Sequence, residues 1–252
     1  MQLVEQHRID QYDPRWIAID GVAFASKNLY NTALYVMRQQ FIATHYVFPE
    51  NELDMLLSPT AQYQTLPRKV AQKVVKQVCE AWKSYFAQVA DYRQHPEKYT
   101  GHPKLPKYLH KQGRNLLVFT YQAISRDPKN AGWIVPYGMP IRVATKLTYT
   151  QIAQVRIIPK ATHYVVEVVY EQEAVDPTLI ASIDIGVNNL AAITSNKSGF
   201  TPLLVNGRPL KSLNQCYNKQ REHRQKRLPK DQFTSRALDE LTDHRHRAIE
   251  SY

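Results

Sequence analysis

One aspartate stands in an apolar segment of the sequence, where a carboxylate calls for a chemical explanation. In SIDIGVNNLAAITSN, residues 182–196, Asp184 lies between two isoleucines and is followed by Gly186 and two asparagines. We expect this segment to be a buried strand. An unpaired buried carboxylate is costly, so it is usually matched by a metal ion, a basic side chain or a helix N-terminus. Asp184 is therefore our candidate catalytic residue and metal ligand, and Mg²⁺ suits an all-oxygen site of this kind.

The chain is strongly basic, with 33 Lys and Arg against 22 Asp and Glu and a formal charge of +11. Such an excess favours a polyanionic partner, usually nucleic acid, over a merely basic soluble protein. Two segments carry candidate contacts. The first holds Lys104, Lys107, Lys111 and Arg114, interleaved with tyrosines, and the second holds Lys211, Lys219, Arg221, Arg224, Lys226 and Arg227. Each segment also fits a plainer interpretation, a solvated connector for the first and a solvated helix face for the second.

Other features exclude several classes of protein. No stretch reaches the roughly 18 apolar residues of a membrane span, and the N-terminal residues lack the apolar core of a signal peptide. Cys79 and Cys216 are the only two cysteines and form no C-x-x-C pair, so neither a zinc site nor a disulfide framework is expected. These features predict a cytoplasmic protein with no membrane partner, and they carry no signal for an oligomeric state.

Helical periodicity governs the first part of the chain. It predicts one helix over residues 26–46, with Ser26 as its N-cap, and a second helix opened by Pro67. A polar, proline-containing stretch separates them. Each helix has an apolar stripe, and we expect the two stripes to pack together. The stripes are Leu29, Ala33, Met37 and Phe41 in the first helix, and Val70, Val74, Val78, Trp82 and Phe86 in the second.

After Asn115 the pattern changes to short β-branched and aromatic runs broken by proline, glycine and asparagine. The runs on either side of residues 159–161 predict a hairpin. Beyond residue 178, two short turns predict three antiparallel strands, followed by a helix after Gly207 and a last helix near the end. Three such strands and a helix, with an aspartate in the first strand, are how a ribonuclease-H-like domain begins.

A second class of protein shares the D-x-G pattern at the end of a first strand. Sugar kinases and actin-like ATPases begin in this way, but glycine or small hydroxyl residues usually follow there to cradle ATP phosphates. Here valine and two asparagines follow, and no second glycine-rich phosphate loop appears among the 8 glycines of the chain. The kinase interpretation is therefore the weaker one.

Longer motifs resemble the TnpB (OrfB) family of insertion-sequence proteins, which is similar to the nuclease half of type V CRISPR effectors. The motifs are FASKNLYNTALYVMRQQF, LPRKVAQKVVKQVCEAWKSYF, HPKLPKYLHKQGRNLLVFTYQAIS, QVRIIP, IDIGVNNLAAITSN and LVNGRPLKSLNQCYNKQ, in that order. The resemblance implies an RNA-guided DNA endonuclease with a RuvC-type magnesium site, whose partners are guide RNA and target DNA.

The resemblance also implies an α+β fold in three parts. These are a helical recognition-like part over residues 1–114, a β-rich wedge-like part over residues 115–177, and the incomplete start of a RuvC or ribonuclease-H-like α/β domain over residues 178–252. The last part contains Asp184.

Only Asp184 matches a catalytic position of the family, whose members supply a later glutamate, a four-cysteine zinc finger and a second aspartate. Glu222, Glu240 and Glu250 fall in predicted helices and are not assigned these roles. Two divalent ions bring about four positive charges together and need several carboxylates. We therefore expect the N-terminal portion of a nuclease that cuts little by itself. The alternatives are a non-cutting regulator that binds RNA and DNA, and an inactive remnant.

Overall fold

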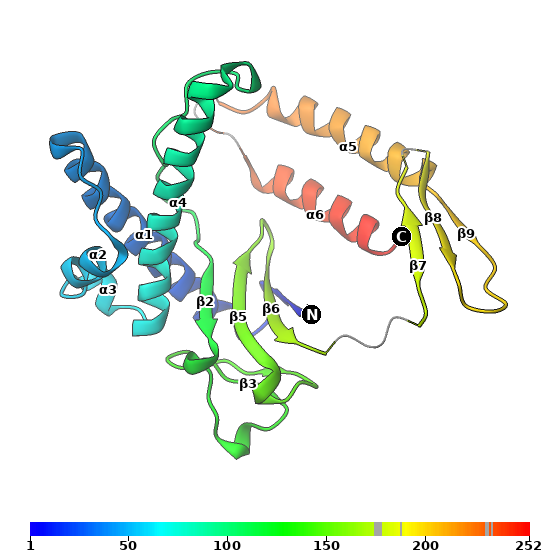
Figure 1. Cartoon of the computed structure of the whole chain (residues 1–252), viewed down its shortest axis with the longest axis horizontal. Coiled ribbons are helices and arrows are strands. Elements are labelled where there is room, and N and C mark those ends of the chain that lie inside the picture. The colour runs from blue at the N-terminus through cyan, green and yellow to red at the C-terminus, as the bar shows by residue number, and fades with distance from the viewer. Residues whose placement is uncertain (174–177, 187, 230–231, 233) are drawn as a thin grey trace. The chain divides into compact units, whose positions relative to one another are not determined.

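The computed structural model describes residues 1–173, 178–186, 188–229, 232 and 234–252 (Figure 1). The chain divides into two compact units, a larger one of residues 2–172 and a smaller one of residues 173–252 together with Met1. Helices and antiparallel sheets both occur, so the predicted α+β class is confirmed. The larger unit spans both the predicted helical and β-rich parts, and the three-part division stays a prediction.

Four helices occupy the first part of the larger unit: α1 (Trp16–Thr44), α2 (Glu50–Leu57), α3 (Ala61–Gln64) and α4 (Arg68–Gln94). The stripes of α1 and α4 pack together as predicted. Their members are buried in one apolar cluster, in which Phe41 meets Trp82 with ring centroids 5.0 Å apart. Phe86 lies at the edge of this cluster and is 40% exposed. The short helices α2 and α3 were not predicted within the polar stretch.

The predicted start of α1 is wrong. The helix begins at Trp16, and Ser26 lies inside it, fully buried, rather than at its N-cap. The apolar periodicity continues upstream through Ile19 and Ala23, which are buried in a second cluster. The Ser26 hydroxyl donates to the carbonyl of Leu116 at 3.4 Å, so it serves tertiary structure instead of capping.

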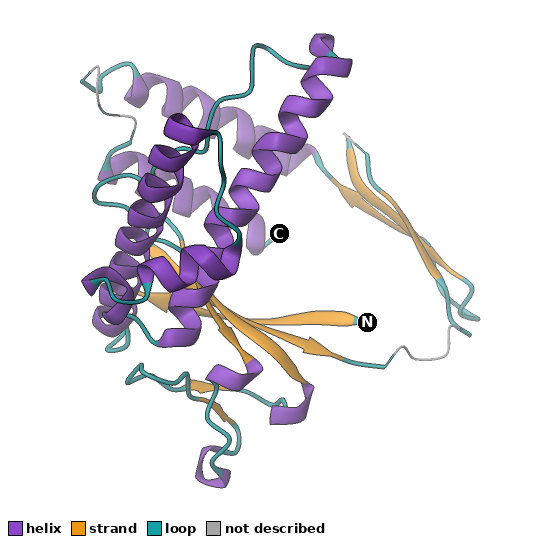
Figure 2. Cartoon of the chain, turned by 60° about the vertical axis from the view of Figure 1, so that its left-hand side comes forward, coloured by secondary structure: helices purple, strands orange, loops and turns teal. Residues whose placement is uncertain are grey.

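A four-stranded antiparallel sheet completes the core of the larger unit (Figure 2). Its order is β1 (Gln2–Asp10), β6 (His163–Glu171), β5 (Ile152–Pro159) and β2 (Leu117–Thr120). The β5–β6 hairpin confirms the prediction around residues 159–161. β1 was not predicted. Two short strands, β3 (Trp133–Ile134) and β4 (Val143–Ala144), form a separate ladder.

The smaller unit contains β7 (Ala181–Asp184), β8 (Asn189–Ser195) and β9 (Leu203–Asn206), then α5 (Arg208–Gln225) and α6 (Arg236–Glu250). The strands are antiparallel in the order β7-β8-β9, as predicted. The prediction that the first strand is buried is wrong, because Ile183 is 59% exposed. α5 and α6 pack on each other, and the isoleucine row of the sheet stays largely accessible in the described chain.

Candidate functional site

Asp184 is the last residue of β7 and is exposed. It pairs across the ladder with Ala192 of β8, while Ile183 pairs with Ile193. Because side chains alternate along a strand, the carboxylate lies on the face opposite the isoleucines. The ion pairs formed among the described residues do not include Asp184. The carboxylate is therefore accessible to a ligand.

Close backbone contacts fix the chain next to Asp184. The amide of Gly186 donates to the carbonyl of Asn189 at 3.1 Å, and the amide of Gly207 donates to the carbonyl of Asn188 at 2.9 Å. A Cβ on Gly186 would lie 3.0 Å from that Asn189 oxygen, and one on Gly207 would lie 3.0 Å from the amide nitrogen of Leu190. Glycine thus permits the close approach at both points, and the start of α5 is held against the residues that enter β8.

The residues around Asp184 do not fit a site for two magnesium ions. Over the described ranges, no group of three or more His, Cys, Asp or Glu side chains is placed to hold a metal. Glu222 is paired instead with Lys226 at 2.7 Å and Glu240 with Arg236 at 2.8 Å, both within their own helices. One carboxylate cannot offset the repulsion between two divalent ions.

α5 presents a run of cations to solvent. Lys211, Lys219, Arg221, Lys226 and Arg227 are exposed. Arg224 is less exposed, since its guanidinium donates to the carbonyl of Ala237 at 2.6 Å and so joins α5 to α6. Lys226 is partly neutralised by Glu222, and its hydrogen bond lowers the pKa of that carboxyl. The exposed cations are available to phosphate groups, and their role in binding nucleic acid stays a prediction.

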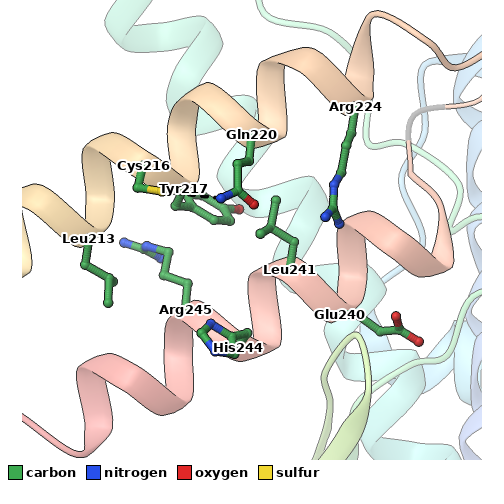
Figure 3. A pocket seen from close by; sticks show the side chains of 9 residues that line it. All are labelled: Leu213, Cys216, Tyr217, Gln220, Arg224, Glu240, Leu241, His244 and Arg245. Atoms are coloured by element: carbon green, nitrogen blue, oxygen red, sulfur yellow. Dashed lines mark hydrogen bonds between the residues drawn. The ribbon is translucent and has the colours of Figure 1, made fainter.

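α5 and α6 enclose a largely apolar groove of about 480 Å³ (Figure 3). Within it the guanidinium of Arg245 lies 5.0 Å from the ring centre of Tyr217 and donates to the side-chain carbonyl of Asn214 at 2.7 Å. The Tyr217 hydroxyl lies 3.0 Å from that of Thr242. These contacts hold the two helices together and leave the cations of α5 on the outer side.

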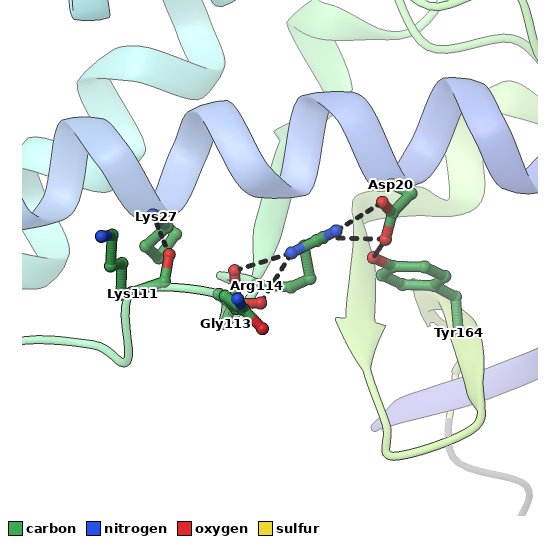
Figure 4. Close-up of polar contacts among 7 residues, drawn as sticks. Asp20, Lys27, Lys111, Gly113, Arg114 and Tyr164 are labelled. Carbon is green, nitrogen blue, oxygen red and sulfur yellow. Dashed lines mark hydrogen bonds and ion pairs between the residues drawn. The ribbon is translucent and has the colours of Figure 1, made fainter. Parts of the chain in front are cut away.

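The first basic segment is fastened along α1. We call residues 103–115 the basic strap. Asn31 grips it through both backbone groups of Leu109, accepting at 2.8 Å and donating at 2.9 Å. Lys27 donates to the carbonyl of Lys111 at 2.8 Å (Figure 4). The strap is thus an ordered part of the larger unit, and the side chains of Lys104, Lys107 and Lys111 are exposed on it.

Arg114 differs from the lysines of the strap. Its guanidinium makes a two-pronged contact with Asp20, at 2.8 Å and 2.7 Å, and Asp20 also accepts from the hydroxyl of Tyr164 at 2.8 Å. Desolvation would raise the pKa of Asp20, but the bonds from Arg114 and Tyr164 outweigh it and hold this pKa below its usual range. The guanidinium already has an intramolecular partner, while the prediction that Arg114 contacts phosphate stays untested.

Lys27 was missed by sequence reasoning. Only 4% of this residue is exposed, and burial, with a smaller effect from the nearby charge of Arg114, lowers its pKa. Its ammonium group also lies 4.1 Å from the ring centre of Phe24. Lys27 lies on the buried side of α1 with Leu34, a position that could have marked it as a polar residue with a structural partner.

A second missed feature is a polar cavity of about 600 Å³ between α2, α4 and the end of β2. Lys69, Lys73 and Lys76 line it from one side of α4, and Glu50 and Asp54 line it from α2. The hydroxyl of Thr120 also lines it and is buried without a hydrogen-bond partner among the described residues. The lysines had been noted only as residues that lie off the apolar stripe.

The described chain is thus a strongly basic α+β protein in which an exposed strand-end carboxylate is followed by a cation-rich helix. Residues 163–252 match the model of the OrfB_IS605 family, described as a probable transposase. The resemblance to the insertion-sequence OrfB family is therefore confirmed over these residues.

Two solved structures are similar over most of the chain. One is a Cas12f1–sgRNA–target DNA complex, with 13% identity and a TM-score of 0.33 over 98% of this chain and 66% of that one. The other is a CRISPR-Cas12f ternary complex, with 13% identity and a TM-score of 0.31 over 92% and 57%. The chain thus spans 66% and 57% of the lengths of these proteins. No curated protein matches it. Among the described helices, none combines the length and apolar character needed to cross a membrane.

Proposed function

We propose that this chain is a nucleic-acid-binding component of a transposon-encoded, RNA-guided DNA endonuclease of the TnpB type, acting in the bacterial cytoplasm on guide RNA and target DNA. The observation that carries the proposal is the run of exposed cations on α5, which lies within the residues that match the OrfB family. The lysines of the basic strap and of the polar cavity support it, because phosphate contacts come chiefly from such side chains.

Salt dependence tests the binding. Fluorescence anisotropy with RNA from the transposon end should show affinity falling steeply between 50 and 200 mM salt, as counterions are released. Replacing Lys219, Arg221 and Lys226 together with alanine should weaken binding and make the log–log slope shallower by about 2, at roughly 0.7 per lost contact on a single strand.

A matched variant controls for net charge. Lys83, Lys160 and Lys197 are exposed on α4, in the β5–β6 turn and in the β8–β9 turn, so their replacement by alanine removes the same charge elsewhere. Equal binding by the two triple variants, or affinity that hardly changes with salt, would contradict the proposal that α5 contacts phosphate.

Cleavage by the isolated chain should be weak or absent. The described residues offer Asp184 without a surrounding set of carboxylates, so Mg²⁺ as a cofactor remains part of the proposal only. The purified chain is incubated with guide RNA, a matching duplex and Mg²⁺, and the products are resolved on a gel. Efficient cutting that Asp184→Ala abolishes would overturn this expectation.

A second candidate function is a non-cutting regulator that binds the same nucleic acids. The exposed, unclustered carboxylate of Asp184 favours it. The chain is added to a cleavage reaction of a complete family nuclease with its guide RNA. Inhibition that rises with dose and is unchanged by Asp184→Ala supports the regulator. An inactive remnant would bind neither RNA nor DNA and would not inhibit.

A further inference from the structure

Aromatic and arginine side chains gather in the larger unit, in the segment between β2 and β5. The guanidinium of Arg126 lies 5.6 Å from the ring centre of Tyr121 and 5.0 Å from that of Tyr149. The Tyr149 hydroxyl donates to the carbonyl of Tyr121 at 2.8 Å, which fixes the second ring relative to the backbone beside the first. Arg126 is exposed and forms none of the ion pairs found among the described residues.

Trp133, in β3, belongs to the same region and is 45% exposed. The guanidinium of Arg142 lies 5.7 Å from its ring centre. Arg142 is oriented by a 2.7 Å hydrogen bond to the side-chain carbonyl of Asn130, whose amide donates to the hydroxyl of Ser125 at 2.9 Å. The tryptophan is therefore flanked by a group whose own position is fixed by a chain of hydrogen bonds.

These side chains line a cavity of about 330 Å³, to which Arg126, Trp133, Lys146 and Tyr149 all contribute. This volume lies at the lower end of the range for small-molecule sites, which begins at about 300 Å³. Backbone contacts tie its walls together, since the amide of Thr145 donates to the carbonyl of Gly132 at 2.9 Å. Gly132 adopts a φ of 78°, a conformation that favours glycine.

The charge around the cavity is positive. Arg126 and Lys146 line it, and both are exposed. The one carboxylate in its lining, Asp127, accepts the backbone amide of Lys129 at 3.0 Å and so caps a local turn. Flat aromatic faces, a guanidinium plane and spare positive charge together suit a ligand that has a planar π system and a nearby phosphate.

We propose that this cavity is a subsite for one unpaired nucleobase of a single-stranded nucleic acid, stacked against Trp133 and the Arg126–Tyr149 pair, with the adjoining phosphate near Lys146. A base inside a duplex is already stacked on both faces and would have to leave its stack to enter. The inference rests on the proposed binding of nucleic acid and adds a preference for unstacked bases that phosphate contacts cannot give.

The test compares strands that differ only in their bases. Wild-type chain is titrated with a labelled 12-nucleotide strand and with an abasic strand of equal length and charge, in DNA and in RNA versions. Because base stacking on one aromatic side chain contributes measurably to affinity, the base-bearing strand should bind about fivefold tighter or more. Trp133→Ala and Arg126→Ala should lower this ratio toward one and leave binding of the abasic strand unchanged.

Controls separate stacking from other effects. Trp133→Phe keeps an aromatic ring and should retain most of the ratio. Tyr12→Ala removes an aromatic residue that is 91% exposed outside the cavity, and Lys160→Ala removes an exposed charge in the β5–β6 turn. Both should leave the ratio unchanged. Circular dichroism checks that each variant is folded, and quenching of tryptophan fluorescence by base-bearing strands should be lost in Trp133→Ala.

Each outcome decides the matter. A ratio near one in the wild type, with both strands bound, overturns the base subsite and leaves the proposed function intact. A high ratio that persists in folded Trp133→Ala and Arg126→Ala also overturns it. If the wild type binds neither strand, the proposed function itself fails, and the subsite fails with it. The DNA and RNA versions show which nucleic acid supplies the base.

Discussion

Replacing Asp20 with asparagine tests the contact that fastens the basic strap to α1. The substitution keeps the shape of the side chain but removes its charge and turns one acceptor of the Arg114 guanidinium into an amino group. Asp20 and Arg114 are 28% and 29% exposed, so the pair is partly screened by solvent. We expect the free energy of unfolding to fall by about 2–3 kcal/mol, within the usual worth of hydrogen bonds to charged groups and below the loss for a fully buried pair.

The pH dependence of this effect has a definite sign. The pKa of Asp20 is lowered in the folded protein, so its contribution to stability is complete above the pKa of the unfolded chain, about 3.9. As the pH falls through the lower, folded pKa, the carboxylate becomes protonated and the contribution is lost. The difference between wild type and Asp20→Asn should thus be full at pH 7 and shrink below about pH 4.

Urea unfolding monitored by tryptophan fluorescence is the assay. All 3 tryptophans, at positions 16, 82 and 133, lie in the larger unit, so the signal reports that unit alone. Asp10→Asn is the matched control, because Asp10 is 57% exposed where it pairs with Arg8 and should contribute about 0–1 kcal/mol. If Asp20→Asn costs no more than Asp10→Asn, or if its cost is the same at pH 3 and pH 7, the reasoning is refuted.

Three further changes have defined outcomes. Burial raises the pKa of Cys79 to about 11, whereas Cys216 is exposed, so a thiol reagent at pH 8 should modify one thiol in the native chain and both in denaturant. Gly138→Ala should lower unfolding free energy by about 1–3 kcal/mol in urea titrations, because Gly138 has a φ of 76° and an added Cβ would lie 2.7 Å from Pro67. Gly21→Ala should instead raise it by about 0.5–1 kcal/mol, since nothing lies within 4 Å of that Cβ and alanine favours a helix; a loss of stability there would count against the structure of α1.

Local patterns predicted much of this fold. The apolar stripes around Met37 and Trp82 follow helical spacing, and each helix buries the side that its stripe indicates. The β5–β6 hairpin and the β7-β8-β9 order were also predictable, because short turns join strands that are neighbours in sequence. In each case the information needed lies within a few tens of residues.

Contacts between distant segments could not be predicted in this way. β1 pairs along its length with β6, so that Gln2 lies opposite Glu171. The partner strand is far away in the chain, and alternation within β1 alone cannot identify it. Ser26 and Lys27 are a second example, because their buried polar atoms are satisfied by the residues 111–116. A polar residue within a helix is costly until its partner is known, and the sequence does not specify that partner.

Asp184 shows why burial was the part of the candidate site that failed. A residue between two isoleucines in a strand points away from both of them, so the pattern is equally expected for a strand with one apolar and one polar face. Whether either face is covered depends on packing elements and not on the strand itself. In the structure, Asp184 shares its face with Ala192, its partner across the ladder, which is also exposed. The carboxylate therefore lies beside a methyl group rather than a cation, which leaves its oxygens open to a ligand.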